Sequence, residues 1–484
     1  MKIQNPFRVI ILLLTFSILA TSCSKTEDIP QDVEVNDFIW GGMNAYYKWQ
    51  GEVPDLSDRK FSTRTQLNSY LSGFSDSEQF FYSLNYRRGD VDRFSWIVDD
   101  YIALENSFQG IRLTSGMKVV VINYADGSDR VFALIRDVVA GSDADAKGIQ
   151  RGMYITEING TQLTSGNVRS LFDNNSFTIT TADYNGGNPT ANGTTFDLIK
   201  TQVTENPVKI TKVINQGAHK IGYIMYNQFS RTFDKELNAA FASLKGENIT
   251  DLVVDLRYNG GGSVRTAVYL ASMITGQFNT QVFSQQIWND KVIEAFKNRP
   301  GYFENNFTDK IENRDANNNV ILSENINSLN QTSVYFIVSD RTASASELVI
   351  NGLKPYIGVN LVGTQTVGKQ VGSITLYDSD NYTKNGEGFN NNHTWAMQPI
   401  VLEIQNKDGD NEPNGYIPDV IIEEDTANLG VLGDPTEPLL ARTIQLITTG
   451  SKTSTRASRS GFNNKAIWNS EMQFPDYNNM YVDF

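Results

Sequence analysis

Cysteine and histidine are scarce in this sequence, and their scarcity limits the chemistry that it can perform. The 484 residues include one cysteine, Cys23, and two histidines, His219 and His393. A single cysteine forms no intrachain disulfide and supplies no set of thiolates for zinc. The His-Glu-x-x-His zinc motif and the Gly-x-Ser-x-Gly serine elbow are absent, and both histidines lie in polar loop sequence. Zinc hydrolysis and a histidine triad are therefore disfavoured.

Basic residues are also in the minority. Lys and Arg number 41 against 55 Asp and Glu, which gives a formal net charge of -14. Proteins that bind nucleic acid neutralise phosphates with clustered basic side chains, and no basic stripe is present, so we expect no nucleic-acid partner. The hydrophobic share of 40% and the aromatic share of 11% indicate packed cores, and the length allows about three domains.

The first residues have the pattern of a bacterial targeting segment. Two basic residues precede an apolar run, residues 9–20, that is too short to cross a bilayer as a helix. The sequence Ala-Thr-Ser-Cys then ends at Cys23 and resembles a lipoprotein processing site, followed by acidic residues like the export tags of Bacteroidota. We expect a signal peptide over residues 1–22, a lipidated linker over 23–35, and a formal charge of about -16 after processing. The expected location is the cell envelope, lipid-anchored to the outer membrane through Cys23, either periplasmic or surface-exposed.

One pair of residues suggests covalent catalysis without imidazole. Ser344 opens the sequence Ser-Ala-Ser-Glu, and Lys369 follows 25 residues later. A buried lysine can lose its proton near neutral pH and serve as the base for a serine. Residues 333–338 are typical of a buried strand and residues 345–353 of a short helix. We therefore expect Ser344 at their junction, where free helix N–H groups can stabilise an oxyanion.

A simpler interpretation of this serine is open at this point. Ser344-x-x-Glu347 is also a capping box, in which the two side chains cap the start of the helix. Capping does not account for Lys369, nor for the glycines at 260–262 that follow a predicted strand at 252–254. Three glycines let backbone N–H groups approach a bound group closely, which suits an oxyanion hole, a phosphate cradle or a flexible loop.

Together these motifs resemble the carboxy-terminal processing, or tail-specific, serine protease family. That family is marked by Asp-Leu-Arg-x-Asn-Gly-Gly-Gly after a strand, then by Ser-Ala-Ser-Glu and Gly-Lys. The three motifs occupy residues 255–262, 344–347 and 368–369 of this chain. The resemblance implies a protease domain with an α/β fold of the ClpP/crotonase-like type, and it implies no metal or organic cofactor.

The resemblance also implies roles for individual residues. Ser344 is the nucleophile and Lys369 the general base. The oxyanion hole is formed by the N–H of Ala345 with that of Gly261 or Gly262.

The chain departs from the family at one position. Many members carry a glutamine four residues after the lysine that orients the amine, and here that position is Ser373. Ser373 can accept a hydrogen bond from an amine, so it is the orienting candidate in this chain.

Two further units precede the catalytic motifs. Residues 36–106 mix helical periodicity with polar breaks and predict a small helical domain. Residues 119–122 and 131–135 then predict a β-hairpin around an Asp-Gly turn. The stretch 138–160, with a short helix, a glycine-rich turn and a strand ending in Ile-Asn-Gly, resembles a PDZ domain.

PDZ domains bind the end of a partner chain as an added strand and hold its carboxylate with backbone N–H groups. On that resemblance the residues lining the carboxylate loop are Phe108, Gln109, Gly110 and Ile111. An ordinary turn before a strand is the alternative interpretation of this region.

Two other ligand motifs are incomplete. Residues 363–370 approach the phosphate-binding loop pattern, but Gln370 replaces the Ser or Thr that binds magnesium, and residues 371–377 alternate like a strand where that loop needs a helix. The acidic loop at 408–412 departs from the calcium-loop spacing and predicts a surface turn.

The sequence thus predicts a multidomain α+β protein. The expected units are the helical domain at 36–106, a PDZ-like β-rich domain at 107–203, a Ser-Lys protease domain at 204–447, and a tail at 448–484 that docks or stays loose. The predicted function is a serine endopeptidase that cleaves unfolded or C-terminal segments of envelope proteins through an acyl-enzyme. The alternative is a catalytically inactive, PDZ-containing lipoprotein that binds peptides.

Overall fold

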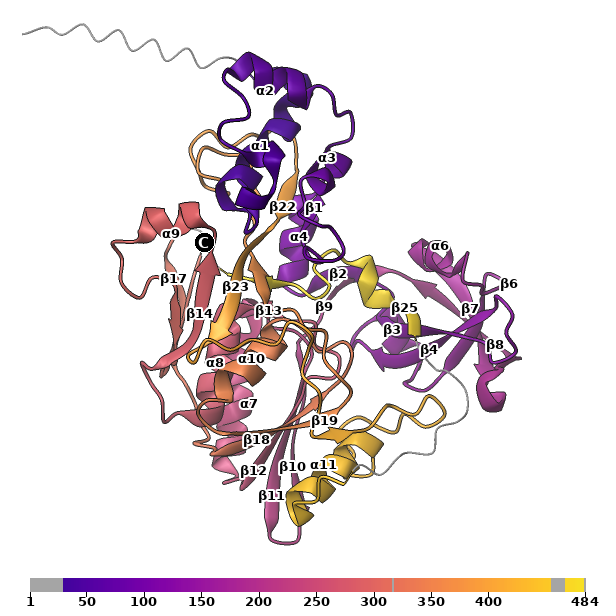
Figure 1. Ribbon diagram of the computed structural model, residues 1–484. Helices are drawn as coiled ribbons and strands as arrows, with labels where there is room; N and C mark the ends of the chain where they lie inside the picture. The colour runs from indigo at the N-terminus through magenta and orange to yellow at the C-terminus, as the bar shows by residue number, and fades with distance from the viewer. Residues whose placement is uncertain (1–28, 316, 454–465, 483–484) are drawn as a thin grey trace, which may run out of the picture.

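The computed structural model describes residues 29–315, 317–453 and 466–482. The expected signal peptide and Cys23 lie outside the described residues. Within those ranges no helix combines the length and apolar character needed to cross a membrane. Figure 1 shows three parts along the chain: an indigo helical part, a purple β-rich part, and a pink to orange α/β part.

The N-terminal part is mainly helical, with one exception to the prediction. Residues 96–98 form a strand, β1 (Trp96–Val98), that pairs antiparallel with β22 (Ala396–Gln398). The expectation of helix is wrong there because two β-branched residues meet a distant strand, and that partner is invisible to local periodicity. The helices are α1 (Glu34–Tyr46), α2 (Arg64–Leu71), α3 (Ser77–Ser83) and α4 (Tyr101–Phe108), with short 3-10 turns η1 (Gln31–Val33), η2 (Gln50–Glu52) and η3 (Pro54–Leu56).

The β-rich unit, residues 107–203, is built around an antiparallel sheet. The predicted hairpin is confirmed, with Val120 opposite Leu134 in the pair β3–β4. The sheet order is β25-β3-β4-β5-β7-β8, β6 pairs with β5, and β2 pairs separately with β9. Its elements are β2 (Ile111–Thr114), β3 (Met117–Asn123), β4 (Val131–Val138), α5 (Asp143–Ala146), β5 (Tyr154–Ile158), β6 (Thr161–Gln162), α6 (Val168–Asp173), β7 (Ser176–Asp183), η4 (Asn185–Gly187), β8 (Thr190–Ile199) and β9 (Thr201–Thr204).

The α/β part begins with a six-stranded sheet of order β10-β11-β12-β18-β19-β24, in which all neighbours after β11 are parallel. Parallel strands are covered on both faces, and alternate residues of β12 do pack on opposite sides. Leu252 and Val254 join the core with α7, α8 and α10, whereas Val253 joins the core with α11. The elements are β10 (Val208–Gln216), β11 (His219–Tyr226), η5 (Arg231–Phe233), α7 (Asp234–Gly246), β12 (Asp251–Asp255), α8 (Val264–Thr275), β18 (Ser333–Val338), α10 (Ala345–Leu353), β19 (Gly358–Gly363), β24 (Val420–Ile421) and α11 (Pro438–Thr449).

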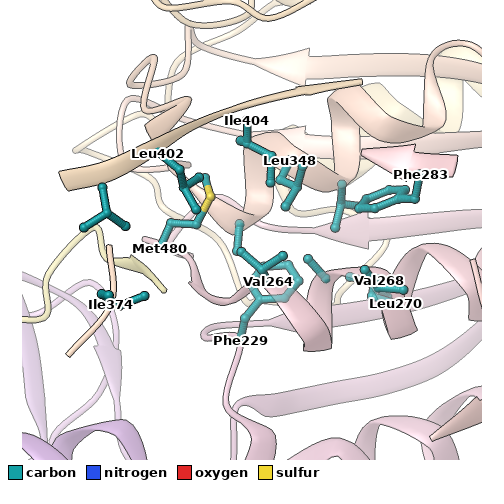
Figure 2. Close-up of a cluster of buried hydrophobic side chains, with 14 of the residues drawn as sticks. Phe229, Val264, Val268, Leu270, Phe283, Leu348, Ile374, Leu402, Ile404 and Met480 are labelled. Carbon is teal, nitrogen blue, oxygen red and sulfur yellow. The ribbon is translucent and has the colours of Figure 1, made fainter. Parts of the chain in front are cut away.

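A second sheet, of order β13-β26-β20-β23-β14-β15, lies across α8 and α10 from the first. Figure 2 shows the apolar side chains of this layer, where Val264 and Leu348 of the two helices meet Leu402 and Ile404 of β23. Met480, from the end of the chain, is buried in the same cluster. The remaining elements are β13 (Gly262–Ser263), β14 (Val282–Trp288), α9 (Asp290–Phe296), β15 (Glu304–Asn306), β16 (Lys310–Arg314), β17 (Val320–Asn325), β20 (Val371–Ser373), β21 (Leu376–Tyr377) and β23 (Ile400–Asn406).

The last described segment, residues 466–482, docks on both of the preceding units. It contains β25 (Ala466–Asn469), η6 (Ser470–Gln473) and β26 (Met480–Tyr481). β25 is the edge strand of the β-rich sheet, and β26 lies between β13 and β20 in the second sheet of the α/β part. Figure 1 shows this yellow segment running from beside β3 toward the middle of the molecule. The sequence predicts a tail that docks or stays loose, and these residues are docked.

Candidate active site

The predicted catalytic motifs follow three neighbouring strands of the parallel sheet. The glycine-rich loop follows β12, Ser344 follows β18, and Lys369 follows β19. The carboxyl ends of adjacent parallel strands lie at the same edge of a sheet, so the topology brings the three loops together. Hydrogen bonds join them directly, from the Ala343 N–H to the Asn259 carbonyl at 3.2 Å and from the Val367 N–H to the Thr342 carbonyl at 3.1 Å.

Ser344 lies at the predicted strand-to-helix junction, directly before α10. Its φ of 66° is in the left-handed region, which a non-glycine residue adopts at a cost. The residue is fully buried. Its Oγ has no hydrogen-bond partner among the described residues. A strained backbone that presents an unbonded hydroxyl beside a helix start is the arrangement expected of a nucleophile.

Glu347 connects the serine and lysine loops. Its Oε2 accepts the N–H of Ser344 at 2.9 Å and the N–H of Lys369 at 2.8 Å, so those two nitrogens bind one oxygen atom. Its Oε1 accepts the hydroxyl of Thr366 at 2.5 Å and the N–H of Gly368 at 2.7 Å. Burial raises the pKa of Glu347, and the four hydrogen bonds oppose that rise. The capping interpretation of Glu347 thus holds together with a second role, because the capping carboxylate also fixes the lysine loop.

Lys369 is buried, with 1% of its surface exposed. Burial lowers the pKa of its amine to about 7, an effect that the charges of Asp92 and Glu347 oppose and that of Arg93 assists. The amine also lies 4.9 Å from the centre of the Phe94 ring. At neutral pH a large fraction of this amine is therefore unprotonated, as a general base for a serine requires.

The hydrogen bond predicted between Lys369 and Ser373 is not formed. The lysine Nζ instead donates to the carbonyl of Asn478 at 2.7 Å. The hydroxyl of Ser373 is 2.5 Å from the side-chain oxygen of Gln398 and 3.0 Å from the carbonyl of Met480. The expectation for Ser373 is wrong because its hydroxyl lies against Gln398 of β22 and against the docked tail, whose strand β26 lies between β13 and β20.

The two candidate oxyanion glycines lie beside the serine. A side chain at Gly261, with φ of +112°, would place Cβ 2.6 Å from Ser344 Cβ. At Gly262, with φ of +132°, Cβ would come 2.1 Å from the Phe229 carbonyl oxygen. Only glycine fits either position. Both N–H groups are bonded, that of Gly261 to Asn259 Oδ1 at 2.9 Å and that of Gly262 to the Asn479 carbonyl at 2.7 Å.

The four predicted peptide-binding residues have different structural surroundings. Phe108 ends α4 and stacks on Tyr481 of the tail at 4.7 Å between ring centres. The Gln109 N–H caps α4, and Ile111 begins β2, which is paired with β9. Gly110 alone of the four borders a cavity of about 50 Å³ between the β-rich unit and the tail. The strand that receives an added strand is β3, and its partner is β25.

The competing motifs show no ligand site among the described residues. The lysine loop continues into β20 rather than into a helix, as the alternation over residues 371–377 predicted. His219 contacts Asp251 and His393 contacts Asp378, away from the serine. Within the described ranges no group of three or more His, Cys, Asp or Glu side chains is arranged to hold a metal ion.

Two contributions to the site had no signal in the sequence motifs. The loop at 92–94 comes from the helical N-terminal part, and its Arg93 donates to the Gly368 carbonyl at 2.8 Å. Residues 478–480 come from the other end of the chain and contact Lys369, Gly262 and Ser373. Both depend on packing between distant segments.

Two family models match this chain. The model of Peptidase family S41 matches residues 220–420, and that of the Peptidase S41 N-terminal domain matches residues 34–96. A similar protein is carboxyl-terminal-processing peptidase 1, chloroplastic, of Arabidopsis thaliana, at 26% identity over 262 residues, covering 53% of this chain and 47% of the relative. Another is the carboxyl-terminal-processing protease of Picosynechococcus, at 23% identity, covering 52% of this chain and 51% of that protein. The chain thus spans about half the length of these relatives.

A solved structure shares the fold over most of the chain. It is a protein of Bacteroides fragilis NCTC 9343 assigned to the S41 proteases, with a TM-score of 0.65 and 22% identity, and the match covers 86% of this chain and 97% of that one. The mixed α/β multidomain architecture is therefore that of S41 protease structures.

Proposed function

We propose that this chain, which belongs to peptidase family S41, is a serine endopeptidase with Ser344 as nucleophile and Lys369 as general base. One observation carries the proposal: a buried lysine whose pKa falls to about 7 shares the Glu347 carboxylate with the serine. Arginine could not replace this lysine, because its guanidinium does not deprotonate in proteins.

The reaction follows from these two groups. The neutral Lys369 amine takes the proton of Ser344 Oγ as the oxygen bonds to the carbonyl carbon of the substrate. The resulting ammonium gives that proton to the leaving amine when the peptide C–N bond breaks, which leaves an acyl-enzyme. The same amine then deprotonates a water molecule, whose oxygen attacks the ester and releases Ser344 with its proton restored.

The negative oxygen of the tetrahedral intermediate needs donors beside the serine. The N–H of Ala345 lies at the start of α10, where the helix dipole favours negative charge, and the glycine loop lies across from it. We assign the oxyanion hole to Ala345 with Gly261 or Gly262. Because both glycine N–H groups are bonded in this structure, one of them must exchange its present acceptor for the substrate oxygen.

The β-rich unit supplies a place for the rest of the substrate. Its strand β3 already accepts one added strand at its edge, which is the way that PDZ domains take up a peptide. We infer that unfolded or C-terminal segments of envelope proteins are the substrates, that they bind at this edge, and that lipid on Cys23 holds the enzyme at the outer membrane.

The test is cleavage of an unfolded protein by the lipid-free chain and by three variants. Ser344→Ala removes the nucleophile, Lys369→Ala removes the base, and Lys369→Arg keeps a cation that cannot accept a proton. All three should lose cleavage, and Ser344→Ala should keep the melting temperature close to that of the parent. Activity of Lys369→Arg equal to that of the parent would refute the neutral-amine mechanism, and absence of cleavage by the parent would favour the inactive peptide-binding lipoprotein.

A further inference from the structure

The nucleophile is inaccessible in this structure. Ser344 exposes none of its surface and Lys369 exposes 1%. A polypeptide substrate must place a carbonyl carbon against Ser344 Oγ, so a segment that covers the serine has to move first. The segment that covers the serine therefore controls access of the substrate.

The end of the tail lies on the catalytic groups themselves. The carbonyl of Asn478 accepts the Lys369 amine, and the carbonyl of Asn479 accepts the N–H of Gly262. The point where a Gly261 side chain would begin is 2.6 Å from the Asn479 carbonyl oxygen and 2.9 Å from Ser344 Oγ. Main-chain carbonyls of the tail thus accept hydrogen bonds from the proposed base and from one candidate oxyanion donor. These are two groups that cleavage of a substrate needs.

The start of the same segment lies on the edge of the β-rich sheet. β25 pairs antiparallel with β3, with Trp468 opposite Val121. The Trp468 side chain is 5% exposed, and its ring centre lies 5.7 Å from that of Phe172 in α6. Its neighbour Ile467 is 39% exposed. An edge strand with one buried aromatic anchor reproduces strand addition by a bound peptide.

Charged contacts hold the stretch between the two ends. Glu471 pairs with Arg136 of β4 at 2.7 Å, and Asp476 pairs with Arg112 of β2 at 2.7 Å. The tail is therefore bound along its length from β3 to the serine, and Figure 1 shows it crossing between the two units.

We propose that the β3 edge beside Phe172 and the catalytic groups Gly262, Ser344 and Lys369 form one continuous peptide-binding track, which the chain's own residues 466–482 fill as an internal competitor of the substrate. This inference rests on the proposed function and adds its regulation. It also defines the substrate class. A polypeptide that displaces the tail presents a large aromatic residue in the place of Trp468 and, twelve residues later, an apolar residue in the buried place of Met480 shown in Figure 2.

Competition of this kind has a measurable signature. If the tail docks with an equilibrium constant well above one, the apparent dissociation constant of any added peptide is raised in proportion. Trp468→Ala removes a buried aromatic side chain from the tail and leaves the track intact, a truncation that weakens docking by a factor of ten or more. The apparent affinity of the track for an added peptide should then rise by about the same factor.

The experiment measures binding of a fluorescein-labelled synthetic peptide, with the sequence of residues 466–482, to the full chain carrying Ser344→Ala. Fluorescence anisotropy should give a dissociation constant at least about tenfold lower when Trp468→Ala is added. Ile467→Ala, which truncates the exposed neighbour in the same strand, should leave the constant unchanged. Glu471→Gln, which keeps the volume and removes the charge that pairs with Arg136, gives a second route to release if Trp468→Ala fails to fold.

Cleavage gives the opposing test. In the chain that retains Ser344, Trp468→Ala should raise kcat/KM on an unfolded protein substrate. A fall in kcat/KM, or equal peptide affinity in the Trp468→Ala and Ile467→Ala chains, overturns the inference and makes the tail a permanent part of the site. Tighter peptide binding with no cleavage by any variant supports the track and its occupant while rejecting the proposed peptidase activity.

Discussion

Replacing Glu347 with glutamine tests how the site is held together. The carboxylate accepts four hydrogen bonds, and three of the donors are backbone N–H groups, from Ser344, Gly368 and Lys369. The fourth donor is the hydroxyl of Thr366. A glutamine of the same shape has one acceptor oxygen and one NH₂ group, so two of the four donors lose their acceptor.

The loss of stability in Glu347→Gln follows from the better of the two orientations that the glutamine amide can take. With the amide oxygen in the place of Oε2, the Ser344 and Lys369 N–H groups keep their acceptor, and the Thr366 hydroxyl can turn to accept from the NH₂ group. The N–H of Gly368 is then left facing another donor in a fully buried position. One unsatisfied buried N–H costs about 1–3 kcal/mol, so Glu347→Gln should lower the free energy of unfolding by at least that amount.

Urea unfolding followed by tryptophan fluorescence measures this loss, with Glu236→Gln as the control. Glu236 is exposed in the first turn of α7, so its substitution should change the free energy by less than about 0.5 kcal/mol. Cleavage should also fall in Glu347→Gln, because the serine and lysine loops lose their shared acceptor. Full stability and full activity of Glu347→Gln would show that the loops are positioned without this carboxylate.

Three further predictions concern the base, the glycine loop and the anchor. Because burial lowers the pKa of Lys369 to about 7, the native state binds fewer protons than the unfolded chain between that value and 10.5, and stability must rise with pH there. In that window the free energy of unfolding of the parent, measured in urea relative to that of Lys369→Met, should rise by about 1.4 kcal/mol per pH unit. The same dependence on pH in both proteins would exclude the lowered pKa of Lys369. Gly261→Ala, whose Cβ would meet Ser344 Cβ at 2.6 Å with φ at +112°, should abolish cleavage and cost at least about 1 kcal/mol in urea unfolding, whereas Gly246→Ala, with no atom near its Cβ, should do neither. Cys23→Ala should move the protein from the membrane to the soluble fraction and prevent labelling by radioactive palmitate; retention of the label would place the lipid elsewhere.

Local patterns were sufficient for the elements that carry the nucleophile. The strand at 333–338 and the helix at 345–353 have the predicted bounds, because the first is a continuous apolar run and the second has a capping sequence and helical periodicity. The glycine loop could also be predicted, since residues 260–262 follow an apolar strand and only glycine fits two of those positions.

The parts that local patterns missed depend on contacts between distant segments. β26 has two residues, which is too short for any periodicity, and it pairs with Gly262 and Ser373 far earlier in the chain. The acceptor of the Lys369 amine is a backbone carbonyl, that of Asn478, and a backbone group leaves no signature in residue type. The orienting role expected for Ser373 failed for the same reason, because its hydroxyl meets Gln398 of β22 and residues of the tail, which no local pattern places beside it.

The proposed mechanism depends above all on the pKa of the Lys369 amine, which can be measured. Heteronuclear NMR of the full chain labelled with [ε-¹³C]lysine follows each lysine through a pH titration, and the signal missing from Lys369→Met identifies this one. We expect a midpoint of about 7, coincident with the acid limb of kcat/KM. A midpoint near 10.5, the ordinary value for lysine, would contradict the mechanism, because a protonated amine cannot take the proton of Ser344.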